Sequence, residues 1–292
     1  MIKVSKKYDK LPEALTRTGC KRKIKRAIEA QSGKGYNGHH YKDGSVKGKL
    51  NEIYKDKCAY CESKIEHAAS LQVEHYRPKD GLTEEASHKG YYWLGCEWSN
   101  LLLACPKCNG KGAKGTKFPI EGIRIQHATA FADMADLKTF DRARLKADCS
   151  DLLTEKPLLL NPELDEPTEH LTFDADGQIE GKTTRGVETI KICKLDRDLL
   201  FKERKQVRDT LLLEIKVAIE GAKTGKLNGE GFQFILNDIF NKLSKRKLPI
   251  QEYSLWTCHC FDNFSVCFVQ KLPPPFQKAI QLAFEAYKKN EL

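Results

Sequence analysis

Two cysteine pairs are the feature that most constrains how this chain can fold. The first is Cys58-Ala-Tyr-Cys61 and the second is Cys105-Pro-Lys-Cys108, with 43 residues between Cys61 and Cys105. Four thiolates in two Cys-x-x-Cys turns are a usual ligand set for tetrahedral zinc. A zinc ion held by four thiolates keeps no position for water. We therefore predict a structural zinc that stabilises a region whose own core is marginal.

Disulfide bonds are the other use that cysteines could have. Eleven cysteines could suggest disulfides, but at 292 residues the chain is longer than the usual small disulfide-stabilised domain. Its first residues lack the apolar core of a secretory signal, so we expect a cytoplasmic protein. In a reducing compartment the Cys-x-x-Cys spacing favours metal binding. No stretch approaches the roughly 18 apolar residues of a membrane span, so no membrane partner is expected.

Between the cysteine pairs lie residues that suit phosphodiester hydrolysis. That reaction needs an activated water and a cation that offsets charge on the phosphate. A histidine ordinarily titrates near neutrality, so His75 could act as the general base. Glu74 and Asn109 could supply oxygen ligands to a catalytic Mg²⁺ or Mn²⁺ ion. The competing interpretation is that His75 is a core histidine with its hydrogen bonds satisfied.

The order of these residues resembles the HNH endonuclease family, whose fold is a ββα-metal finger. The match runs Cys-x-x-Cys, Glu74-His75-x-x-Pro, Asn100-Leu and Cys-x-x-Cys-Asn109, and covers about residues 50–120. The resemblance implies that His75 is the base and that Glu74 and Asn109 bind the catalytic metal. It also implies that Asn100 braces the loop carrying the base, although Asn100 could equally be a helix N-cap. Glu replaces the commoner Asp at position 74, and Asn replaces His at position 109.

A second resemblance extends further along the chain, to the nuclease subunit of Septu-type anti-phage systems. It rests on Cys58–Glu62, Glu74–Lys79, Tyr92–Leu94, Trp98–Leu101, Pro157–Pro162 and His170–Phe173. Such subunits work beside an ABC-type ATPase, sometimes with a retron. The resemblance implies that the C-terminal half docks this partner.

Excess positive charge is confined to the N-terminal part. Residues 1–57 hold 16 Lys and Arg against 6 Asp and Glu, and the remaining 235 residues hold 34 of each. A charge run is often only a solvated helix face. Beside a nuclease-like centre, we interpret it as a basic arm that contacts phosphates. Its densest part consists of Lys21, Arg22, Lys23, Lys25 and Arg26.

Four more basic residues flank the predicted centre. Lys107, Lys111 and Lys114 belong to or follow the second cysteine pair, where they could contact phosphates or simply be solvated. Arg77 could clamp the scissile phosphate or form a local ion pair. The choices for Arg77 and for the lysines remain open from sequence.

The periodicity of apolar residues predicts an α+β protein in two parts. Residues 1–125 would form the basic helical arm and the zinc-stapled nuclease module, and 126–292 a mainly helical region. Helices are expected near 11–30, 46–54, 128–148, 196–219, 232–244 and 276–289. A strand is expected over 71–76, a hairpin with an Asp-Gly turn over 170–179, and a strand-like segment over 253–272. That segment would bury Cys258 and Cys260 on one face, away from His259.

Together these features predict a metal-dependent nuclease that cuts nucleic acid, with DNA as the favoured substrate. Two alternatives remain. The same chemistry could act on structured RNA such as tRNA, because both polymers expose phosphates. A non-catalytic zinc module could instead bind nucleic acid or scaffold the ATPase, although binding alone requires neither His75 nor Glu74.

Overall fold

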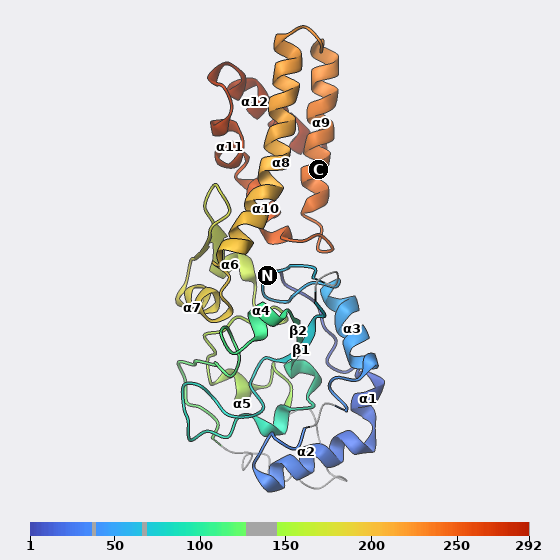
Figure 1. The fold of residues 1–292 in the computed structure, drawn as a ribbon, viewed down its shortest axis with the longest axis vertical. Coiled ribbons are helices and arrows are strands. Elements are labelled where there is room, and N and C mark those ends of the chain that lie inside the picture. The colour runs from blue at the N-terminus through green and yellow to red at the C-terminus, as the bar shows by residue number, and fades with distance from the viewer. Residues whose placement is uncertain (37–38, 66–68, 127–144, 292) are drawn as a thin grey trace. The chain divides into compact units, whose positions relative to one another are not determined.

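The computed structural model describes residues 1–36, 39–65, 69–126 and 145–291, and these form an α+β protein (Figure 1). Contacts divide the chain into two compact units. The first contains Met1–Leu171 and Gly181–Leu195, and the second contains Thr172–Glu180 and Asp196–Leu292. The predicted boundary near residue 125 therefore lies inside the first unit. Most of the helix expected over 128–148 lies outside the described residues.

Short helices and one small sheet build the first unit. Its elements are α1 (Glu13–Thr16), α2 (Thr18–Ala30), α3 (Gly44–Tyr54), β1 (Gln72–His75), the 3₁₀ helices η1 (Tyr92–Leu94) and η2 (Trp98–Asn100), β2 (Leu101–Ala104), α4 (Pro106–Asn109), α5 (Ser150–Leu153), α6 (Pro167–His170) and α7 (Thr184–Cys193). Strands β1 and β2 pair antiparallel, with Glu74 opposite Leu102 and His75 opposite Leu101. Every residue of β2 is buried, so this strand runs through the core.

Residues 145–171 belong to the first unit because they complete its core. Ile120 pairs with Pro157 in an antiparallel bridge. Glu155 is fully buried and accepts hydrogen bonds from Arg77 (2.9 Å) and the Tyr91 hydroxyl (2.7 Å). The two contacts of Glu155 join positions more than 60 residues apart, and local composition carries no signal of such pairing.

The N-terminal segment is packed on the first unit. Lys6 is buried, and its ammonium group donates to the carbonyl oxygens of Trp98 (2.7 Å) and Leu101 (2.6 Å). Helix α2 contacts η1 and buries Ile24, while Arg22 and Arg26 are exposed. The positive charges of Arg22 and Arg26 are thus presented to solvent by a helix that packs on the first unit.

Helices dominate the second unit. Its strands lie in the hairpin formed by β3 (Leu171–Phe173) and β4 (Ile179–Gly181), whose first and last residues belong to the first unit. The remaining elements are α8 (Asp198–Lys223), α9 (Gly229–Arg246), α10 (Ser254–Asp262), α11 (Phe264–Cys267), η5 (Val269–Lys271) and α12 (Pro274–Glu291). Helices α8 and α9 lie side by side (Figure 1). The aromatic core of this unit includes Phe264 of α11 and Phe284 of α12, whose stacked rings have centroids 3.8 Å apart.

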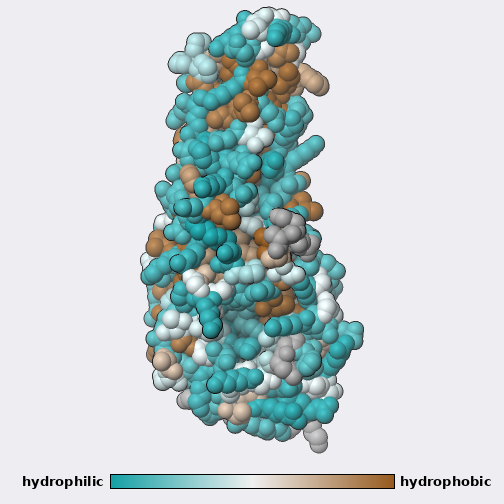
Figure 2. Space-filling view, viewed as in Figure 1, coloured by the Kyte–Doolittle hydropathy of each residue, from teal (hydrophilic) through white to brown (hydrophobic). Residues whose placement is uncertain are grey.

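An apolar groove lies on the α8–α9 pair. Its volume is about 420 Å³, and Leu213, Val217, Leu227 and Ile235 supply its apolar walls. Leu213 is 62% exposed and Val217 is 64% exposed. Figure 2 shows apolar residues gathered over these helices.

The prediction of a strand-like segment over 253–272 is wrong, because these residues form α10, α11 and η5. Trp256, Cys260, Phe264 and Cys267 are all buried and recur at helical spacing. The alternation of Trp256, Cys258 and Cys260 fits a strand equally well over so short a window. The Trp256 indole N–H donates to the Arg204 carbonyl oxygen (2.7 Å), which fixes α10 against α8.

No helix in the described part of the chain has both the length and the apolar character that a bilayer span requires.

Candidate functional site

The two cysteine pairs converge into one buried cluster. The Sγ atoms of Cys58, Cys61, Cys105 and Cys108 all lie within 4.8 Å of one another. Those of Cys61 and Cys105 are 3.8 Å apart. A tetrahedral site with Zn–S bonds of about 2.3 Å places its sulfur atoms about 3.8 Å apart. The cluster could therefore hold a zinc ion, as the sequence predicted.

Glu74, His75 and Asn109 line a single cavity of about 460 Å³. β1 carries the first two, and Asn109 ends α4 directly after the cysteine cluster. The full lining consists of Tyr41, Lys42, Lys47, Leu71, Gln72, Val73, Glu74, His75 and Asn109. A carboxylate, an imidazole and an amide that are separate in sequence thus meet at one site.

The Gly95 carbonyl and the Tyr41 ring hold the His75 ring in one orientation. Its Nε2 atom lies 3.0 Å from the Gly95 carbonyl oxygen, which can only accept, so Nε2 carries the proton. The neutral ring then keeps its lone pair on Nδ1. The Tyr41 ring packs edge-on against the imidazole, with centroids 4.7 Å apart. Burial lowers the pKa of His75 to about 3, and nearby lysines including Lys79 add to this effect.

Glu74 is a buried carboxylate paired with a buried lysine. Its Oε1 atom forms an ion pair with the Lys114 ammonium group, and both side chains are at most 5% exposed. Lys114 also donates to the His75 carbonyl oxygen (2.8 Å). Burial raises the pKa of Glu74, and the charge of Lys114 opposes that rise.

The two asparagines have different surroundings. The amide N–H of Asn109 donates to Gln72 Oε1 (3.0 Å), a contact that leaves the lone pairs of Asn109 Oδ1 for a cation. Asn100 bonds both backbone groups of Arg77: its Oδ1 accepts from the Arg77 N–H (2.8 Å), and its Nδ2 donates to the Arg77 carbonyl (3.0 Å). Asn100 lies outside the cavity lining and fixes the turn that follows His75.

Oxygen donors of this kind suit a hard divalent cation. Glu74 offers a carboxylate and Asn109 an amide oxygen at the same cavity, and Mg²⁺ and Mn²⁺ prefer such ligands. The Lys114 ammonium beside Glu74 already balances the charge of that carboxylate. By donor type alone, these two oxygen ligands fit a divalent ion.

Two of the predicted nucleic-acid contacts are buried instead. Arg77 is 1% exposed, and its guanidinium group pairs with Glu155 (2.9 Å) and donates to the Leu152 carbonyl (2.6 Å). Lys114 is fully buried against Glu74. Neither can meet a phosphate on the surface, because each already compensates a carboxylate that the fold removes from water.

The other predicted basic contacts reach solvent to different degrees. Lys107 and Lys111 are exposed near Asn109. On α2, Arg22 and Arg26 are exposed, whereas Lys21, Lys23 and Lys25 are half-buried.

Sequence reasoning missed four residues around His75. Tyr41, Lys42 and Lys47 line the cavity, and Gly95 supplies the carbonyl that orients the ring. A β-carbon on Gly95 would lie 2.5 Å from the Tyr36 ring, so only glycine fits there without displacing that ring. Lys42 and Lys47 belong to the basic N-terminal part, but no spacing in the sequence links them to His75.

Comparison with known proteins gives a consistent set of relatives. Septu protein PtuB of Bacillus mycoides (strain KBAB4) is 36% identical over 193 residues, which are 64% of this chain and 59% of that protein. Septu protein PtuA of the same strain is 30% identical over 162 residues, 54% of this chain and 20% of PtuA. Septu protein PtuB of Bacillus thuringiensis is 26% identical over 211 residues, 72% of this chain and 64% of that protein.

No family model and no solved structure matches the chain. It covers less than two thirds of each of these three relatives. The similarity nevertheless spans more than half of this chain in every case. It identifies the chain as a homologue of the Septu proteins PtuB and PtuA.

Proposed function

We propose that this protein is a metal-dependent HNH endonuclease that hydrolyses phosphodiester bonds in nucleic acid. One observation carries the proposal: Glu74, His75 and Asn109 line a single cavity beside a four-cysteine cluster. The order β1, β2, α4 supports a ββα-metal arrangement. A module that only bound nucleic acid would need neither a held imidazole nor a buried carboxylate.

His75 acts as the general base in this proposal. Its Nε2 proton is held by the Gly95 carbonyl, so Nδ1 is free to take a proton from a water molecule in the cavity. Asn100 limits movement of the turn at Arg77 and so keeps His75 in place. Glu74 and Asn109 would hold a divalent ion, which when bound offsets negative charge on the phosphate and the leaving oxygen.

Basic residues around the cavity would bind the nucleic-acid backbone. Lys42 and Lys47 lie in its wall, and Lys107 and Lys111 are exposed beside Asn109. These contacts would neutralise phosphates without recognising the base sequence, so they suit DNA and structured RNA alike. We propose DNA as the substrate and treat tRNA as the alternative arm of the test.

We also propose a role in anti-phage defence beside a second Septu protein, an ABC-type ATPase. The relatives named PtuB and PtuA support this assignment. The apolar groove on α8 and α9 supports partner docking on the helical unit, because Leu213 and Val217 are largely exposed there.

A cleavage assay tests the enzymatic proposal. Plasmid DNA and tRNA are incubated with the protein and Mg²⁺ or Mn²⁺, with the ATPase partner present in a parallel set. We expect His75→Ala to lower the cleavage rate by at least about 100-fold, the usual contribution of a positioned base. His170→Ala is the matched control, because His170 contacts Thr183 outside the cavity. Unchanged cleavage by a zinc-replete His75→Ala protein would reject the mechanism.

A further inference from the structure

The cavity at Glu74 is lined by more positive than negative charge. Lys42 and Lys47 contribute two ammonium groups to its wall. Glu74 is the single carboxylate among the described residues that form the lining. Its charge is already balanced by Lys114. A bare divalent cation would therefore enter a site that favours anions.

Lys114 is fixed in place by its surroundings. Its backbone N–H donates to the Cys108 carbonyl (3.1 Å), which ties it to the cysteine cluster. Its ammonium group donates to the His75 carbonyl (2.8 Å) and pairs with Glu74. Lys114 is fully buried and is not among the residues that line the cavity, so it reaches the carboxylate from the protein side. A cation arriving through the cavity could not expel it into solvent.

Two oppositely directed effects then act on a divalent ion at Glu74. The carboxylate and the Asn109 oxygen attract it, while Lys114, Lys42 and Lys47 repel it. A phosphate in the cavity would change this balance, because it adds negative charge and one or two further oxygen ligands. The same phosphate would be attracted by Lys42 and Lys47.

From this charge balance we infer that the free protein binds its divalent ion weakly, and that ion and nucleic-acid phosphate bind cooperatively. The inference rests on the proposed function, because it assigns Glu74 and Asn109 to the ion. Lys114 is a positioning residue here: it fixes the Glu74 carboxylate, balances its charge and so sets the strength of ion binding. The ion then enters mainly with substrate, which limits metal-loaded enzyme in the absence of nucleic acid.

Binding measurements test this coupling without relying on cleavage. His75→Ala protein, which should bind without cutting, is titrated with Mn²⁺ and followed by electron paramagnetic resonance. Its affinity for a short DNA duplex and for tRNA is measured by fluorescence anisotropy with and without Mn²⁺. We expect Mn²⁺ to tighten binding of the cleavable polymer by roughly tenfold or more, within the usual range of coupling between sites. Equal affinities with and without Mn²⁺ would overturn the inference.

Two charge variants of the His75→Ala protein separate the effect of Lys114 from the effect of the lysines in the cavity wall. Lys114→Met should bind Mn²⁺ more tightly in the free protein and show a smaller gain on adding duplex. Lys42→Gln/Lys47→Gln should also bind Mn²⁺ more tightly but bind duplex more weakly, and it alters side chains in the cavity wall rather than a buried ion pair. Lys216→Gln/Lys226→Gln, exposed on the helical unit, is the control with the same charge change.

Zinc content and melting temperature establish that each variant is folded. Weaker or unchanged Mn²⁺ binding by both folded charge variants would overturn the inference. That result would leave the nuclease proposal intact if wild-type protein cuts and His75→Ala does not. Failure of wild-type protein to cut any polymer, with the coupling present, would instead count against the nuclease proposal alone.

Discussion

At the scale of single residues, Arg77 connects the candidate base to the rest of the first unit. Asn100 holds its backbone, and Glu155 holds its guanidinium group 78 residues further along the chain. The guanidinium carbon also lies 5.1 Å from the centre of the Phe118 ring. A side chain two residues after His75 is thus fixed at both ends, which supports a structural role in keeping the base in place.

Replacing Arg77 with methionine should destabilise the protein strongly. The change leaves the buried Glu155 carboxylate without its cation, and breaking a buried pair this way costs about 3–5 kcal/mol of unfolding free energy. Urea unfolding followed by tryptophan fluorescence measures the loss. The double variant Arg77→Met/Glu155→Gln should recover part of it. The contrary outcome is a stable Arg77→Met protein whose nucleic-acid affinity depends less steeply on salt, by about one phosphate contact. That result would show that Arg77 contacts the nucleic-acid backbone.

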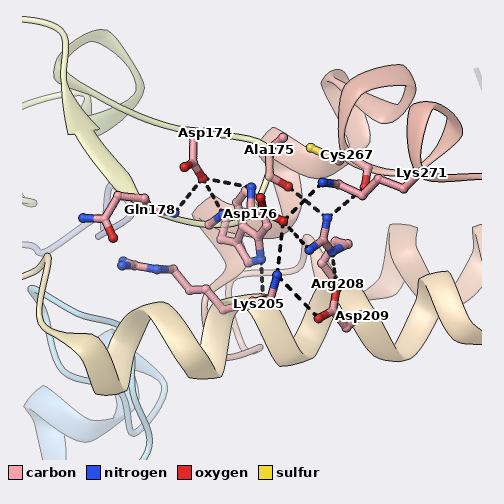
Figure 3. A network of polar contacts seen from close by, with 12 residues as sticks. Asp174, Ala175, Asp176, Gln178, Lys205, Arg208, Asp209, Cys267 and Lys271 are labelled. Atoms are coloured by element: carbon pink, nitrogen blue, oxygen red, sulfur yellow. Dashed lines mark hydrogen bonds and ion pairs between the residues drawn. The ribbon is translucent and has the colours of Figure 1, made fainter.

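At the scale of elements, the hairpin of the second unit is fixed by one carboxylate in its turn. Asp176 Oδ1 lies 2.7 Å from Arg208, 3.2 Å from Lys271 and 3.3 Å from Lys205, so three cations from α8 and η5 meet it (Figure 3). Asp174 caps the same turn by accepting three backbone N–H bonds of 2.8 Å. The hydrogen bond from Arg208 is the main reason that the pKa of Asp176 is lowered.

Replacing Asp176 with asparagine should therefore weaken the second unit in a pH-dependent way. Asp176 is 41% exposed, so we expect a loss of about 1 kcal/mol, as for surface ion pairs. Because the folded pKa lies below the ordinary 3.8, the stabilisation is present above pH 3.8 and is lost as pH falls further. Urea unfolding at neutral pH and near pH 3 measures this, and the difference in unfolding free energy between wild type and Asp176→Asn should be smaller in acid. Exposed Asp262→Asn serves as the control, and a deficit that grew in acid would contradict this account.

Local patterns in the sequence predicted elements better than they predicted pairing. The helical spacing of residues 11–30 and 196–219 anticipated α2 and α8, and the Asp-Gly turn anticipated the hairpin. The four cysteines were found from spacing alone, because each Cys-x-x-Cys pair is a local feature of the sequence. The burial of Arg77 and Lys114 was not predictable. Their partners lie 78 and 40 residues away, and a lysine in a Gly-rich segment has the local sequence of a surface residue.

At the scale of the whole molecule, the two units differ in what stabilises them. The helical unit has an apolar core of its own, in which Phe240, Phe264 and Phe284 contact one another. The first unit has short elements, and the cysteine cluster joins the segment before β1 to the segment after β2. Ala59, within the first pair, donates to the Leu103 carbonyl (2.7 Å), so loss of the cluster would also disturb β2.

Removing zinc should therefore unfold the first unit and leave the second folded. Zinc binding in small structural sites contributes about 10–16 kcal/mol, which equals or exceeds the roughly 5–15 kcal/mol stability of a whole domain. We expect one zinc per chain by mass spectrometry. Once a chelator or Cys108→Ser removes it, calorimetry should show only the transition of the second unit, with a smaller total unfolding enthalpy than the zinc-bound protein. Helical circular dichroism should persist in the zinc-free protein, because α8, α9 and α12 do not contain the ligands. Cys193→Ser, which alters a buried cysteine outside the cluster, is the control. Zinc-free protein that kept the full unfolding enthalpy and tryptophan signal of the zinc-bound protein would mean that the first unit folds without the metal.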